Sequence, residues 1–338
     1  MKILAIETSC DETAVAVGED TNILSSMVSS QVPIHKKYGG VVPEIAARHH
    51  LENIIPLLRS ALDEAKVTLM DIDVIGVTQG PGLVGALLIG ISLAKSIAYT
   101  LNIPLVGVNH LQGHIYANFI DNPDLTPPLL ALVVSGGHTE LVYQSDWGKF
   151  EVMGSTRDDA AGEAFDKVSR LLNLGYPGGP AIQEAAKRGK PDAIPFPRPL
   201  LDKGFDFSFS GLKTSVLYYT RAHRDYNSSD VAASFQEAIV DVLIAKTIKA
   251  AKAKRVRRVV LAGGVAANER LRQKLKKALL KEDFALYLPS LALCIDNAAM
   301  IERVAYEKAL KNEFASLDMN AVSNLDLASQ HMVGEKTR

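Results

Sequence analysis

The chain repeats one short pattern of strands and turns, and this repetition limits the available folds more than any other feature. LAIETSCDETAVAV aligns with LALVVSGGHTELVY at an offset of 126 or 127 residues. Each copy holds an apolar strand, a turn with a serine (Ser9 or Ser135), and a second strand opened by a threonine (Thr13 or Thr139). With 338 residues and 47% hydrophobic content, the chain can bury two cores. The sequence therefore predicts an α/β protein of two similar domains.

The spacing of apolar residues predicts the regular elements around these two units. In the first half we expect strands within 2–8, 13–18, 22–30, 73–82 and 104–108, and helices over 43–65 and 84–101. A proline-rich break follows at 123–128. In the second half we expect strands within 129–135, 139–144, 149–155 and 258–264, and helices near 160–174, 178–188, 208–221, 229–252 and 268–281.

Two histidines, His110 and His114, stand four positions apart after the strand at 104–108. On a helix this spacing places both imidazoles on one face, which is a spacing typical of metal ligands. A capping or hydrogen-bonding histidine beside a solvated one is the alternative, and a metal site would need a third ligand. The zinc-protease pattern needs a glutamate directly after the first histidine, but Leu111 occupies that position. A protease of that class is not supported.

Two glycine-rich turns could bring backbone amides to a ligand. Ser135, Gly136 and Gly137 join two strands, and the pair Gly263–Gly264 joins a strand to a helix with Asn268 in its first turn. Glycine lets a ligand approach the backbone closely, and turn amides and helix N-termini favour phosphate oxygens. The alternatives are an ordinary tight hairpin and a common strand-to-helix turn.

The net charge of -1 and the pI of 6.7 do not point to nucleic acid, but the positive charge is unevenly distributed. Twelve lysines and arginines lie between Lys246 and Lys277, against a single acid, Glu269. One interpretation of this excess is that the cations lie on the solvated faces of two helices. The alternative is a surface that binds a phosphate backbone. Apolar stretches are shorter than a bilayer span, and two cysteines make no disulfide framework. We expect a cytoplasmic protein without membrane contact.

Several motifs together resemble one family. AIETSCDET, GVNHLQGHIYA, VVSGGHTELV, DDAAGEAFDKVSRLL, FSFSGLKT, AGGVAANERLR and CIDNAAMI are similar to the bacterial tRNA N6-adenosine threonylcarbamoyltransferase (TsaD) family, in the same order from about residue 2 to about residue 310. The resemblance implies a duplicated actin-like, Hsp70-like and sugar-kinase-like fold with an interdomain cleft. It also implies a first domain of 1–109 plus 297–325, a second of 110–296, and a flexible tail over 326–338.

The resemblance also implies an activity: transfer of an L-threonylcarbamoyl group from threonylcarbamoyl-AMP to N6 of adenosine 37 in tRNAs that read codons beginning with A. One divalent metal ion, Fe²⁺ or Zn²⁺, would bind to His110, His114 and Asp296; Asp296 could also cap the helix that follows it, instead of or in addition to binding the metal. The cleft would also accept ATP, ADP or AMP. The substrate-binding residues carried over from the family are Val133, Val134, Ser135, Gly136, Gly137, Asp166, Gly179 and Asn268.

Asp11 and Glu12 are the candidate catalytic acids, because they lie in the first serine-containing turn. Structural alternatives exist for Asp166, in an ion pair with Lys167 or Arg170, and for Gly179, in a helix-entry turn. Where some relatives have an acid that contacts the ligand, this chain has Gln183.

The implied partners are tRNA, a smaller actin-like paralogous subunit (TsaB-type), a P-loop ATPase (TsaE-type) and an upstream threonylcarbamoyl-AMP synthase. Three rival functions are a metalloprotease, an actin-like ATPase or sugar kinase, and a non-catalytic binding subunit. Leu111 argues against the first, and a kinase would not need the two histidines. The presence of His110, His114 and Asp296 argues against the third.

Overall fold

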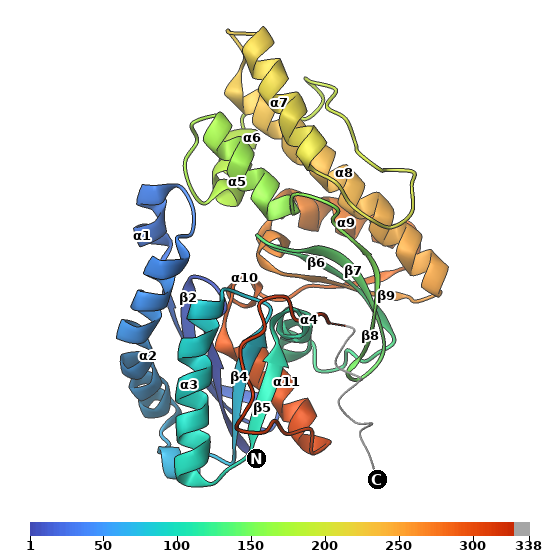
Figure 1. Ribbon diagram of the computed structural model, residues 1–338. Helices are drawn as coiled ribbons and strands as arrows, with labels where there is room; N and C mark the ends of the chain where they lie inside the picture. Colours follow the sequence, from blue (N-terminus) through green and yellow to red (C-terminus); the bar gives the residue numbers. More distant parts are fainter. Residues whose placement is uncertain (328–338) are drawn as a thin grey trace. The chain divides into compact units, whose positions relative to one another are not determined.

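The computed structural model describes residues 1–327, which form two compact units (Figure 1). Of the described residues, unit 1 contains 1–125 and 289–327, and unit 2 contains 126–288. The first junction lies in the predicted proline-rich break. The units differ from the division at 109/110 and 296/297, since 110–125 and 289–296 belong to unit 1. Most of the expected tail, 328–338, lies outside the described residues, whereas Leu327 is buried.

Unit 1 is built on a five-stranded mixed sheet in the order β3-β2-β1-β4-β5. β1 is antiparallel to β2 and parallel to β4, which is parallel to β5. Its strands are β1 (Lys2–Glu7), β2 (Glu12–Glu19), β3 (Asn22–Ser30), β4 (Val74–Gly80) and β5 (Leu105–Asn109). Its helices are α1 (Val32–His35), η1 (Lys36–Tyr38), α2 (Pro43–Ala65), η2 (Leu69–Asp71), α3 (Val84–Leu101), α4 (His110–Asp121), α10 (Leu291–Cys294) and α11 (Ala298–Leu310).

Unit 2 has a second five-stranded sheet, in the order β10-β9-β6-β7-β8. Its strands are β6 (Leu129–Val134), β7 (Thr139–Asp146), β8 (Lys149–Ser155), β9 (Arg258–Ala262) and β10 (Ala285–Tyr287). Its helices are α5 (Ala161–Leu171), α6 (Gly178–Ala186), α7 (Ser210–Ala222), α8 (Ser228–Lys254), η3 (Gly264–Ala267) and α9 (Glu269–Leu280). Strand order and direction match those of unit 1, with β6 in the place of β1. The predicted duplication is therefore confirmed.

In unit 1, helices cover both faces of the sheet. α2 and α3 pack on one face, where their apolar stripes meet the buried strands in one core. α11 packs on the other face and also contacts α4. A Cβ at Gly76 of β4 would lie 2.7 Å from the Cβ of Ala305, so this glycine allows α11 to approach the sheet closely. In unit 2, α8 is buried along most of its length and packs against α6, α9 and the sheet.

Helix α3 is long and apolar enough to cross a membrane by length and composition alone. Its buried residues, which include Leu87, Ile91 and Ala94, belong to the core of unit 1. A core helix of a globular protein passes the same test, so its apolar character is explained by this packing.

Glu302 is a buried carboxyl on α11 that the sequence analysis did not single out. It is 0% exposed, and neither of its oxygens accepts a hydrogen bond from the described residues. Burial, only partly offset by the charge of Arg303, raises the pKa of Glu302 to about 8. The folded protein therefore holds a proton here that the unfolded chain releases above its ordinary pKa of 4.5.

We expect Glu302→Gln to become progressively more stable than the wild type as pH rises from 5 to 8. A raised carboxyl pKa makes folding lose up to about 1.4 kcal/mol per pH unit in this window, and the neutral amide removes that loss. Thermal unfolding across the window checks this, with the exposed Glu64→Gln as the control. A Tm difference between Glu302→Gln and wild type that does not change with pH would contradict the prediction.

Candidate functional site

Helix α4 presents the two predicted histidines from its buried N-terminal half. The Asn109 side chain caps the helix by accepting hydrogen bonds from the backbone amides of Leu111 and Gln112. His110 therefore occupies the first helical position, and His114 lies one turn later on the same face. Their ring centroids are 4.6 Å apart, and both residues are buried. The expected helical geometry of the pair is confirmed.

Asp296 lies beside both histidines. Its Oδ1 atom is 3.5 Å from Nε2 of His110 and 3.2 Å from Nε2 of His114. The helix N-cap is the next residue, Asn297, which accepts a hydrogen bond from the amide of Met300. The alternative role of Asp296 as the N-cap is therefore wrong.

This segment is held against α4, because the backbone amide of Ser290 donates a hydrogen bond to the carboxylate of Asp121. The contact joins the C-terminal end of α4 to the stretch that leads to α10 and Asp296. It is a physical reason why 289–296 and α4 belong to one unit.

The three side chains have the composition and spacing of a metal site. One ligand atom from each of His110, His114 and Asp296 lies within 4.8 Å of the others. Both ring nitrogens of His114 are buried, and neither makes a hydrogen bond to the described residues; the carboxylate of Asp296 lies 3.2 Å from Nε2 but is not aligned for one. A buried imidazole without hydrogen bonds is costly unless it binds a ligand. Two imidazoles and a carboxylate suit Zn²⁺ or Fe²⁺ and leave coordination positions for other ligands. The residues therefore fit a divalent metal ion.

Charge around His110 supports the same conclusion. Burial lowers the pKa of His110, but the carboxylates of Asp296 and Glu7 outweigh it and raise this pKa to about 9. Without a metal ion the cluster therefore holds a proton at neutral pH. A divalent cation would displace that proton, because a histidine ligand must be neutral at the coordinating nitrogen.

Glu7, at the end of β1, positions His110 and is a residue that the sequence analysis missed. Its Oε2 atom lies 3.0 Å from Nδ1 of His110 and accepts a hydrogen bond from the Thr78 hydroxyl at 2.6 Å. Its other oxygen accepts from the amide of Ser9. Burial raises the pKa of Glu7, but the positive charge and hydrogen bond of His110 lower it below its ordinary value. An ionised carboxylate only accepts, so it holds the Nδ1 proton and leaves Nε2 for a metal.

A sequence signal for Glu7 existed. It is a charged residue at the carboxyl end of a buried strand, and β1, β4 and β5 are parallel neighbours. Their carboxyl ends share one edge of the sheet, which is where ligands bind in open α/β sheets. His110 follows the end of β5 at that edge.

Of the candidate acids, Asp11 lies in the turn between β1 and β2, and Glu12 is the first residue of β2. Asp11 is buried, while Glu12 is half-buried and accepts a hydrogen bond from the Ser30 hydroxyl at 2.9 Å. Burial of its carboxyl and the negative charges of Asp296 and Asp11 raise the pKa of Glu12 to about 9. His50 braces the turn through Thr13 and the Cys10 carbonyl oxygen. The turn is thus fixed within unit 1.

The glycine-rich turns of unit 2 lie next to each other at the ends of neighbouring parallel strands. Val133 of β6 pairs with Ala262 of β9, so Ser135 follows one strand where Gly263 follows the other. Gly263 has a φ of +88°, and a Cβ there would lie 2.5 Å from the Val134 carbonyl oxygen. A Cβ at Gly136 or Gly137 would meet nothing within 4 Å, so this turn leaves open space beside its backbone.

The remaining expected substrate residues of unit 2 have structural partners. The Asp166 carboxylate accepts a hydrogen bond from the amide of Gly178 at 2.6 Å, at the first residue of α6. Asn268 caps α9 through the Leu271 amide and donates to Gln236. Gln183 accepts from the amide of Glu269. Space beside Gly179 is open, since a Cβ there would meet nothing within 4 Å. Substrate contacts of these residues remain predictions.

The duplicated mixed sheets and the potential metal site of unit 1 define the class: an actin-like α/β protein with two histidines and an aspartate that could hold a metal ion. The crystal structure of HypF from T. kodakarensis shares the fold, with a TM-score of 0.66 at 16% sequence identity. The match covers 92% of this chain and 48% of that chain, so this chain spans about half of its length.

Sequence comparison identifies the family. The model of tRNA N6-adenosine threonylcarbamoyltransferase, TsaD, matches residues 22–303. The protein of that name from Kosmotoga olearia is 58% identical over 330 residues, covering 97% of this chain and 100% of the relative. The one from Thermosipho melanesiensis is 56% identical over 328 residues, with 97% and 100% covered. This chain belongs to the tRNA N6-adenosine threonylcarbamoyltransferase family, a family of transferases.

We expect Glu7→Gln to weaken the binding of Zn²⁺ by about 10–100-fold, which is the usual effect of removing a partner that orients a metal-binding histidine. The amide group of glutamine would face donors on Ser9, Thr78 or His110. Titration of metal-free protein against a chelating indicator measures the affinity. Glu302→Gln is the matched control, because it makes the same change at another buried carboxyl of unit 1, one that has no hydrogen bond to a histidine. Equal affinities for all three proteins would refute the role of Glu7.

Proposed function

We propose that this protein transfers the L-threonylcarbamoyl group of threonylcarbamoyl-AMP to N6 of adenosine 37 in tRNAs that read codons beginning with A. The observation that carries this proposal is the cluster of His110, His114 and Asp296, in a chain that matches the family over almost its full length. We place the protein in the cytoplasm, where its tRNA substrate would be available.

The reaction forms a bond between N6 and the carbamoyl carbon and breaks the bond from that carbon to the adenylate phosphate oxygen. The amine loses a proton, and AMP leaves with the electron pair of the broken bond. Such a transfer needs the two reactants held close together, the developing negative charge stabilised and the proton removed.

His110, His114 and Asp296 would hold the metal ion, and Glu7 would fix the orientation of His110. When bound, a divalent ion supplies Lewis-acid stabilisation of negative charge on substrate oxygens. Either Zn²⁺ or Fe²⁺ is compatible with this donor set. The position of the metal ion would be fixed by the protein, because the helices beside these ligands, α4 and α11, are buried at their N-terminal ends and capped there.

In unit 2, the turn Ser135–Gly137 would accept the adenylate part of the substrate. Open space beside Gly136, Gly137 and Gly179 lets a ligand approach the backbone, and turn amides stabilise phosphate oxygens. Val133 and Val134 would contribute backbone contacts at the end of β6. Asp166 and Asn268 would then act through the ends of α6 and α9 that they fix. ATP, ADP or AMP would occupy the same place.

Glu12 is the better candidate of the two turn acids for handling the proton of N6. A carboxyl whose pKa is raised to about 9 binds a proton near neutral pH, whereas an ordinary carboxylate does not. With a metal ion held by His110, His114 and Asp296, the pKa of Glu12 would fall toward the working range. Asp11 would contribute negative charge to the same turn.

We expect His110→Ala and Asp296→Ala each to lower formation of threonylcarbamoyl-adenosine by about 100-fold or more, since loss of a direct ligand exceeds the ~10–100-fold effect of its outer partners. The assay supplies tRNA, the adenylate synthase, the smaller actin-like subunit and the P-loop ATPase, and reads tRNA nucleosides by mass spectrometry. His223→Ala, at an exposed histidine after α7, serves as the control. Full activity in both metal-site variants would remove the metal from the mechanism.

A further inference from the structure

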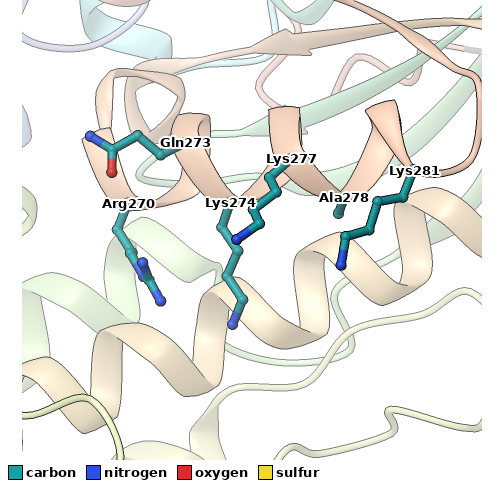
Figure 2. A pocket seen from close by; sticks show the side chains of 6 residues that line it. All are labelled: Arg270, Gln273, Lys274, Lys277, Ala278 and Lys281. Carbon is teal, nitrogen blue, oxygen red and sulfur yellow. The ribbon is translucent and has the colours of Figure 1, made fainter.

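We propose that one face of α9 binds the phosphate backbone of the tRNA substrate; this inference rests on the proposed function. The face borders a groove lined by Arg270, Gln273, Lys274, Lys277, Ala278 and Lys281. Figure 2 shows the four cationic side chains extending from the same side of the helix. We call this surface the α9 groove.

The helical spacing explains why these cations share one face. Positions 270, 274, 277 and 281 recur every three or four residues, which is the repeat of one side of a helix. The buried apolar face of α9 is formed by Leu271, Leu275 and Leu279. From Arg270 to Lys281 the row extends about 16 Å along the axis, at about 1.5 Å per residue. That length is greater than the size of one phosphate group, so the row suits a chain of phosphates such as a nucleic-acid backbone.

Two of the cations are fixed by acids of α8, and the other two have no acidic partner in the part of the chain that the structure describes. Arg270 forms an ion pair with Glu237 at 2.7 Å, and Lys274 pairs with Glu237 and Asp241. Lys277 and Lys281 have no such partner among residues 1–327 and are exposed. The C-terminal half of the groove therefore carries positive charge that the described part of the protein does not neutralise, and an anionic ligand would do so.

The structure separates this surface from the rest of the basic segment 246–277. Lys246 is buried and donates to the Lys203 carbonyl oxygen. Other members of the segment form ion pairs with acids, as Lys252 does with Glu282, Lys254 with Glu151 and Arg257 with Asp283. Most cations of the sequence segment therefore already have an acid or a carbonyl oxygen of unit 2 as a partner.

Within the segment, Arg255, Lys276 and Lys277 lack a partner among the described residues. Lys277 lines the groove, whereas Lys276 does not. Successive helical residues are rotated by about 100° from each other, so Lys276 provides an equal charge at almost the same height on another side of the helix.

The test compares Lys277→Gln with Lys276→Gln, and adds the double variant Lys277→Gln/Lys281→Gln. The full chain, assembled with its partner proteins, is titrated into fluorescently labelled unmodified tRNA at several KCl concentrations. We expect the double variant to bind tRNA more weakly and to lower the slope of log affinity against log salt by about 2, one for each lost phosphate contact. Lys276→Gln should match the wild type, and Tm values should agree among all variants.

Steady-state transfer separates this inference from the proposed function. We expect the double variant to raise the KM for tRNA and to leave kcat unchanged, because Lys277 and Lys281 would contact the phosphate backbone and not the groups that react. Wild-type transfer with an unchanged KM and salt slope in the double variant would overturn the α9 groove alone. Equal weakening by Lys276→Gln would also overturn it, as would competition by inorganic phosphate at constant ionic strength, which indicates a small-anion site. Wild-type protein that binds tRNA through the groove but transfers nothing would overturn the proposed function instead.

Discussion

The close packing of α4 on α11 is the constraint on which the candidate metal site depends. A Cβ at Gly113 would lie 3.0 Å from Cδ1 of Ile301 and 3.1 Å from Cγ of Met300, tighter than almost all real contacts. A glycine on α4, between the two histidines, therefore lets the helices approach each other. This approach brings the start of α11, and with it Asp296, to the histidine face of α4. Without it, Asp296 would not share a site with two histidines that precede it by more than 180 positions.

The two units have the same sheet, but the turns that follow β1 and β6 carry residues of different chemistry. The first strand of each unit, β1 or β6, ends at a serine-containing turn. Each of these strands pairs with a parallel neighbour, β4 or β9. In unit 1 this edge holds carboxylates and histidines, with Glu7 on the strand and Glu12 beyond the turn. In unit 2 the equivalent turn has Gly136 and Gly137, whose missing side chains leave the backbone open. One fold thus offers a site for a cation in one unit and a place suited to an anion in the other.

The sequence predicted local structure well and long-range packing less well. The helices at 43–65 and 84–101 have the bounds that their apolar repeats indicated, because periodicity records which face is buried. The three-residue strand β10 was missed, since so short a segment carries no period. The assignment of α4 and 289–296 to unit 1 depends on contacts such as Ser290 with Asp121, which no local pattern contains. Recognition of motifs found His110, His114 and Asp296, whereas Glu7 required the sheet order.

The charges of the unit 1 site argue that metal binding and folding are linked. Glu7, Glu12 and Asp296 act on His110, and burying that much negative charge is unfavourable unless it is neutralised. Without a metal ion, protons do this, because the pKa values of His110 and Glu12 are both raised to about 9. A divalent cation would replace protons at the same place. Metal binding should therefore be accompanied by proton release and become stronger as pH rises, and the folded state gains the binding energy that the unfolded chain cannot obtain.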